Sequence, residues 1–146
     1  MKNNLSKALA YCSKNIRCKS EVVYKIKTWN LDSEEETNII EFLDLHNFFF
    51  SDESYIDKYL ENISSVKGYS KIQLKIKLLK KNISPKLIDI KLNEYFKDNE
   101  EFELVKFIKR NSRKLKSKPR EDVIKYLLSK GFKYNHISKN IDMDNL

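Results

Sequence analysis

Few residues in this 146-residue chain have side chains that commonly carry out catalysis or bind metals, and their spacing fits neither role. Cys12 and Cys18 lie six positions apart, and His46 and His136 lie ninety apart, which is not the spacing of zinc ligands. We interpret Cys12 as a small core residue and Cys18 as a free thiol, as expected in a reducing compartment. The sequence therefore predicts no metal site and no catalytic triad.

A carboxylate pair or a phosphate-binding loop would be the remaining routes to an enzyme. Asp52 and Asp57 are five positions apart, and Asp52 stands where a helix-capping residue is expected. With only two glycines, the chain contains neither GxGxxG nor GxxxxGK[ST]. These features favour a non-enzymatic protein that needs no cofactor.

Binding to an anionic partner is the chemistry that the charged residues favour. The net charge is +8, but residues 1–66 hold 8 Lys and Arg against 11 Asp and Glu, whereas residues 67–146 hold 21 against 10. Such polarity attracts a polyanion or an acidic protein surface. The candidate partner-binding or DNA-binding residues are Lys67, Tyr69, Lys71, Lys75, Arg110, Arg113, Lys114, Lys116, Lys118 and Arg120.

Each candidate also has a simpler interpretation. Tyr69, between Lys67 and Lys71, could stack on a nucleic-acid base, but it could equally be a packing residue. The lysines could simply solvate helix faces. The run Arg110 to Arg120, RNSRKLKSKPR, is the most basic stretch of the chain and favours a binding role more strongly than Lys71 and Lys75 do.

The elements that must position these side chains are predicted to be helices. The chain has only two glycines and two prolines, too few for an all-β fold, so we predict an all-α protein. There is no apolar run of eighteen residues and no secretory signal pattern, so we expect a cytoplasmic protein without a membrane contact.

The central stretch, residues 50–83, predicts two amphipathic helices joined at Gly68. Leu74, Leu78 and Leu79 are expected to form the buried stripe of the second helix. Earlier in the chain, Ser33 and Glu36 have the spacing of a capping box.

The sequence between Pro85 and Pro119 predicts two further helices. Pro85 is expected at the start of a sixth helix. A separate seventh helix is expected around Leu104, Val105 and Ile108, before the basic run.

An internal repeat organises the chain. Asn30, Asn82 and Gly131 are separated by 52 and 49 residues, and each follows aliphatic residues four and eight positions earlier. These offsets describe one helix face that ends in a left-handed cap residue. We predict three tandem three-helix repeats, at residues 1–50, 51–98 and 99–146, which pack in series into an elongated, curved array.

Three blocks in this order resemble the RecX family of bacterial regulatory proteins. The first block is similar to the pattern RSxxELxxKLxxxG, with Cys18 in place of Ser and Asn30 in place of Gly, and it comprises Arg17, Cys18, Glu21, Val22, Lys25, Ile26 and Asn30. The second block comprises Phe50, Asp52, Glu53, Tyr55, Tyr59, Lys67, Gly68, Tyr69 and Ile83. The third, Tyr126 to Phe132, resembles a terminal LLxxRGF signature.

The resemblance implies a monomeric, non-enzymatic protein that binds the RecA recombinase and its filament on single-stranded DNA. It implies inhibition of filament growth, ATP hydrolysis and strand exchange, in homologous recombination, DNA repair and the SOS response. The alternative that we keep open is a stand-alone helical nucleic-acid-binding protein that acts through its basic C-terminal half.

Overall fold

The structure, a computed structural model, describes residues 2–63 and 68–141. Over these residues the chain is helical, which confirms the predicted all-α class. The helices are α1 (Lys2–Lys14), α2 (Lys19–Lys27), α3 (Ser33–Leu45), α4 (Asp52–Ile63), α5 (Lys71–Leu79), α6 (Pro85–Arg110), α7 (Ser112–Lys116), α8 (Arg120–Ser129) and α9 (Tyr134–Asn140).

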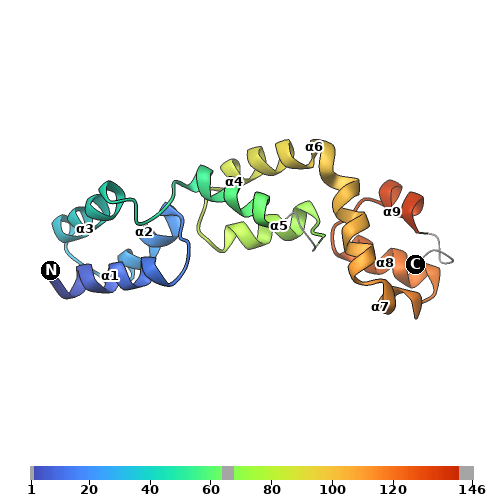
Figure 1. Ribbon diagram of the computed structural model, residues 1–146, viewed down its shortest axis with the longest axis horizontal. Coiled ribbons are helices and arrows are strands. Elements are labelled where there is room, and N and C mark those ends of the chain that lie inside the picture. Colours follow the sequence, from blue (N-terminus) through green and yellow to red (C-terminus); the bar gives the residue numbers. More distant parts are fainter. Residues whose placement is uncertain (1, 64–67, 142–146) are drawn as a thin grey trace.

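The helices follow one another along a single long axis (Figure 1). Helices α1 to α3 lie at one end, α4 and α5 lie in the middle beside the first part of α6, and α7 to α9 lie at the other end. None of the described helices has the length and apolarity that crossing a bilayer requires.

The buried side chains form three clusters along this axis. The first, from α1 to α3 and the segment after them, comprises Ala8, Cys12, Val22, Ile26, Ile39, Leu43 and Phe49. The second comprises Cys18, Tyr55, Ile56, Leu60, Leu74, Leu78, Ile83, Ile88, Leu92 and Phe96. The third comprises Leu104, Phe107, Ile108, Leu115, Val123, Leu127, Phe132, Ile137 and Ile141.

Helix α6 corrects the prediction of separate sixth and seventh helices. It is one continuous helix of 26 residues. Its first part contributes Ile88, Leu92 and Phe96 to the second cluster, and its second part contributes Leu104 and Phe107 to the third. The polar segment 97–101 between them lacks apolar residues but contains no helix breaker, so the helix continues through it. The predicted repeat boundary at residues 98 and 99 falls inside α6, and the division into three repeats stays a prediction.

Left-handed backbone at the predicted cap positions is confirmed. Asn30, Asn82 and Gly131 have φ angles of 54°, 64° and 99°. Asn47, which follows the C-terminal cap of α3, has a φ of 57° and was not predicted. Asn and Gly tolerate this conformation better than other residues, which explains why these residue types end the helices.

Two local predictions were wrong. The residue that caps α3 is Asp32, whose side chain accepts a hydrogen bond from the backbone N–H of Glu35 at 2.8 Å, so Ser33 lies inside the helix. Leu79, expected in the buried stripe of α5, is 38% exposed, whereas Leu74 and Leu78 are fully buried. At 100° per residue, Leu79 lies about 100° from Leu78 and points away from the core.

Candidate partner-binding surface

The basic run 110–120 forms a corner between three helices. Arg110 ends α6, α7 follows at once, and Arg120 begins α8. Leu115, in the middle of the run, is fully buried in the third cluster and anchors the corner. The charged side chains around it point outward: Lys118 is half-buried, and the exposed ones are Arg110, Arg113, Lys114, Lys116 and Arg120.

None of these six cations has a carboxylate partner among the residues that the structure describes. Two of the six, Lys114 and Lys118, lie near the ring of Tyr126, on α8. The Nζ atom of Lys114 lies 3.2 Å from the hydroxyl of Tyr126 and 4.4 Å from its ring centroid. Lys118 and Lys130 lie 5.6 and 5.4 Å from the same centroid. The corner therefore carries positive charge that no ion pair within the described chain neutralises.

The central candidates differ from the corner because they have partners within the chain. Lys67 lies outside the described residues. The Nζ atom of Lys75 lies 2.8 Å from Asp89, and that of Lys71 donates to the side-chain oxygen of Asn93. These contacts join α5 to α6, so they support the structural interpretation of both lysines.

Tyr69 is half-buried against the second cluster, and its backbone N–H donates to Glu103 at 3.4 Å. The Nζ atom of Lys77 lies 5.5 Å from its ring centroid. This environment fits the packing interpretation better than base stacking.

The structure also separates the two groups of candidates. Ser70, which precedes α5, donates a hydrogen bond from its hydroxyl to the carbonyl of Lys130, just beyond the C-terminal end of α8. Arg120 stands at the opposite end of α8. A helix of ten residues is about 15 Å long, so the two groups do not form one compact site.

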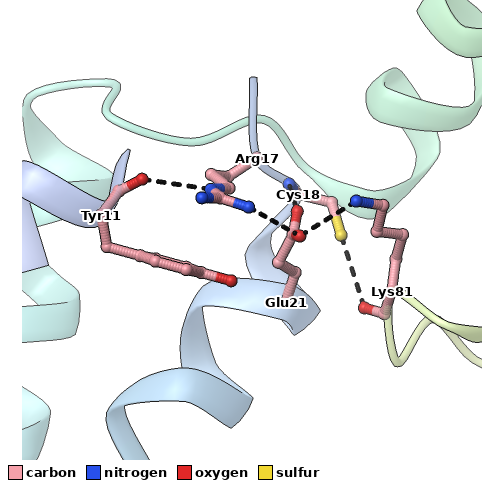
Figure 2. Close-up of polar contacts among 5 residues, drawn as sticks. All are labelled: Tyr11, Arg17, Cys18, Glu21 and Lys81. Carbon is pink, nitrogen blue, oxygen red and sulfur yellow. Dashed lines mark hydrogen bonds and ion pairs between the residues drawn. The ribbon is translucent and has the colours of Figure 1, made fainter. Parts of the chain in front are cut away.

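The junction between α2 and the end of α5 contains a buried carboxylate whose importance the sequence did not reveal. One oxygen of Glu21 lies 3.2 Å from Arg17 and 3.2 Å from Lys81, and its other oxygen accepts from the backbone N–H of Cys18 at 3.4 Å (Figure 2). Arg17 in turn donates to the carbonyl of Tyr11 at 3.1 Å and lies over its ring. The Glu21 side chain is 8% exposed, so this ion pair is largely shielded from water.

At two places, the side chain of a helix-capping residue donates a hydrogen bond to a backbone carbonyl that follows a later helix. The Cys18 thiol donates to the carbonyl of Lys81 at 3.7 Å, and the Ser70 hydroxyl donates to the carbonyl of Lys130. The two donors cap α2 and α5 and are 52 residues apart; the two acceptors precede Asn82 and Gly131 and are 49 residues apart. These are the separations used to define the predicted repeat.

The contact of Cys18 requires a protonated thiol. Burial raises its pKa to about 11, so the thiol keeps its proton at neutral pH and can donate. In the unfolded chain the same thiol loses its proton near pH 9, so over this window the unfolded state binds fewer protons and stability falls as pH rises.

We expect the free energy of unfolding to decrease above about pH 9, by at most about 1.4 kcal/mol per pH unit for this group. Urea unfolding at a series of pH values measures it. Cys18→Ser keeps a hydrogen-bond donor but has no titratable thiol, so its free energy of unfolding should decrease less between pH 9 and 10 than that of wild type. Equal decreases in the wild-type and Cys18→Ser proteins would contradict the assignment of this pH dependence to Cys18. Tyr55, whose pKa burial raises to about 12, should add to the loss at higher pH in both proteins.

A second buried carboxylate lies where α6 passes from the second cluster to the third. Glu103 is fully buried and accepts from the Tyr95 hydroxyl at 2.5 Å, while the Nζ atom of Lys106 lies 2.9 Å away. Burial, and then the hydrogen bond to this carboxylate, raise the pKa of Tyr95. The sequence signal for this site was weak: Glu103 stands beside Leu104 and one helical turn before Phe107, but Asn99 and Lys106 share its side of the helix.

Comparison with known proteins agrees with the fold and finds relatives of the family that the sequence resembles, although no protein-family model matches the chain. The chain is 30% identical to the regulatory protein RecX of Clostridium acetobutylicum over 92% of its length, and 31% identical to that of Clostridium botulinum over 89%. It spans 65% and 63% of the lengths of these two curated relatives.

A solved structure agrees with the helical arrangement. The crystal structure of RecX from Lactobacillus salivarius is similar to this fold with a TM-score of 0.72, at 20% identity, over all of both chains. At that identity the likeness establishes the fold. Together with the sequence relatives, it supports a RecX family protein.

Proposed function

We propose that this protein is a non-enzymatic, cytoplasmic regulator that binds RecA and its filament on single-stranded DNA. In this proposal it reduces filament growth, ATP hydrolysis and strand exchange during recombination and DNA repair. The observation that carries the proposal is the basic corner 110–120, whose cations have no carboxylate partner within the described chain, on an elongated array of the RecX family. Such a surface suits an acidic face of the filament or DNA phosphates.

A second candidate function is direct nucleic-acid binding without RecA. The lysines around Tyr126 favour it, because Tyr126 offers an aromatic ring among three cations, a combination that single-strand binders use. In that case affinity for naked single-stranded DNA should fall steeply with salt.

Neutralising the corner tests both functions. We expect the quadruple variant Arg113→Gln, Lys114→Gln, Lys116→Gln and Lys118→Gln to bind RecA filaments about tenfold more weakly, because it removes four charges from one surface. Co-sedimentation with filaments measures this loss. A control variant with the same charge change replaces four exposed lysines elsewhere, Lys14, Lys19, Lys86 and Lys97, and should bind like wild type.

The two functions predict different results for naked single-stranded DNA. If RecA is the partner, wild-type protein should bind filaments far more tightly than naked DNA at physiological salt. If DNA alone is the partner, the affinities should be similar, and the quadruple variant should lose about one unit of logarithmic salt slope per phosphate-contacting cation removed. Filament binding that is equal in the wild-type and quadruple proteins would contradict a role of the corner in either function.

A further inference from the structure

Helix α5 has apolar side chains on two opposite faces, and only one of them is buried. Leu74 and Leu78 pack into the second cluster with no exposed surface. On the other side, Ile72 is 56% exposed, Ile76 is 50% exposed and Leu79 is 38% exposed. At 100° per residue these three fall within about 60° of one another and form one stripe along the helix.

The predicted repeat does not require an apolar stripe at these positions. Under the separation of 52 residues, its three positions correspond to Ser20, Tyr24 and Lys27 on α2, and under the separation of 49 residues they correspond to Glu121, Lys125 and Leu128 on α8. Each of those helices therefore has one apolar or aromatic side chain where α5 has three. All three helices contribute a buried face, so among these three helices the exposed apolar stripe occurs in α5.

Positive charge borders the stripe. Helix α5 contains three lysines and no acidic residue. On the helical wheel Lys75 lies to one side of the stripe and Lys80, just after the helix, lies to the other. Lys80 and Lys77 are exposed, and neither has a carboxylate partner among the described residues, whereas Lys75 pairs with Asp89. Lys80 borders the stripe directly, whereas Lys77 lies farther round the helix, near Tyr69. A partner that buries the stripe would bring its own carboxylates against Lys80 at a gain in electrostatic complementarity.

We propose that the α5 stripe of Ile72, Ile76 and Leu79 is a protein-docking surface. It takes a segment of a partner protein that presents apolar side chains beside carboxylates, whereas the corner 110–120 contacts phosphates or acidic residues elsewhere. This inference rests on the proposed function, because it takes that partner to be RecA. The two surfaces differ in physical character, since an apolar contact depends weakly on salt and a phosphate contact depends on it strongly.

The test measures binding of the full chain to RecA without DNA and, separately, to naked single-stranded DNA. The variant combines Ile76→Gln with Leu79→Gln, since Ile72 also lies against Gly131 and is left intact. We expect at least a tenfold loss of affinity for RecA and an unchanged affinity and salt slope for DNA. The matched control is Tyr24→Gln, which changes the corresponding exposed position on α2 and should bind RecA like wild type.

The outcomes separate this inference from the proposed function. If wild-type protein binds neither RecA nor its filament, both are overturned. If wild-type protein binds RecA and the double variant binds equally well, the stripe is not the docking surface and the proposed function stands.

Two other results would overturn the proposal by showing that a different occupant covers the stripe. In the first, the double variant keeps RecA binding but loses self-association. In the second, it keeps RecA binding but loses binding to anionic vesicles. Should the double variant melt at a lower temperature than wild type, Ile76→Gln alone, at a half-exposed position, repeats the comparison and should still lose affinity for RecA about threefold or more.

Discussion

Replacing Gly68 with alanine should destabilise the protein by about 3 kcal/mol or more, the largest effect that we expect from a single methyl group. A Cβ atom at this position would lie 2.1 Å from the carbonyl oxygen of Glu103 and 2.3 Å from the backbone nitrogen of Phe107. Both atoms belong to the backbone of α6, which is held by buried side chains on two clusters and cannot move aside locally. Gly68 is therefore required for a close approach of two backbone segments.

The control for Gly68→Ala is Gly131→Ala. A Cβ atom at Gly131 would meet the Ser70 hydroxyl at 2.9 Å and the Ile72 side chain at 3.1 Å, and side chains can shift more easily than a helix backbone. The φ of 99° adds strain of about 1 kcal/mol or more. Urea unfolding followed by helical circular dichroism should rank Gly68→Ala as the more damaging change. A Gly68→Ala protein within about 0.5 kcal/mol of wild type would contradict the close approach.

Replacing Glu21 with alanine should cost about 3 kcal/mol, because it leaves buried cationic groups without their carboxylate. Arg17, whose side chain is 11% exposed, would lose its ion pair, and the backbone N–H of Cys18 would lose its acceptor. The contact with Lys81 joins α2 to the end of α5, so its loss should also loosen the junction between the first two clusters. Thermal and urea unfolding measure the change in stability.

A matched substitution on the surface shows whether burial is the cause. Asp89 pairs with Lys75 at 2.8 Å, and the two side chains are 45% and 38% exposed, so Asp89→Ala should cost less than about 1 kcal/mol. Similar losses for Glu21→Ala and Asp89→Ala would mean that the buried network contributes no more than a surface ion pair.

Much of the fold could be predicted because helix faces and caps are local properties. The apolar spacing in the central stretch predicted helices on either side of Gly68, and asparagine at 30 and 82 predicted left-handed backbone. The continuity of α6 could not be predicted from periodicity, because residues 97–101 are all polar. In this segment the helix leaves the second buried cluster and has not yet reached the third. The role of Gly68 depends on α6, a segment distant in sequence, and so leaves no local signal.

The candidate surface was predictable only in part. A run of cations such as 110–120 can be read directly from the sequence. Whether each cation has an ion-pair partner depends on its neighbours in the folded structure. The pairing of Lys75 with Asp89 and the position of Tyr126 among three lysines are of this kind. For α5, periodicity showed two apolar faces without showing which one is buried, so Leu79 was assigned to the wrong side.

The rate of DNA-dependent ATP hydrolysis by RecA, measured with increasing amounts of this protein, tests the central claim most directly. The RecA should come from the same organism, and filaments should form before the protein is added. The account predicts that substoichiometric protein lowers the rate, and that the quadruple variant of the basic corner lowers it less. An unchanged rate over a broad range of protein-to-RecA ratios would contradict the account.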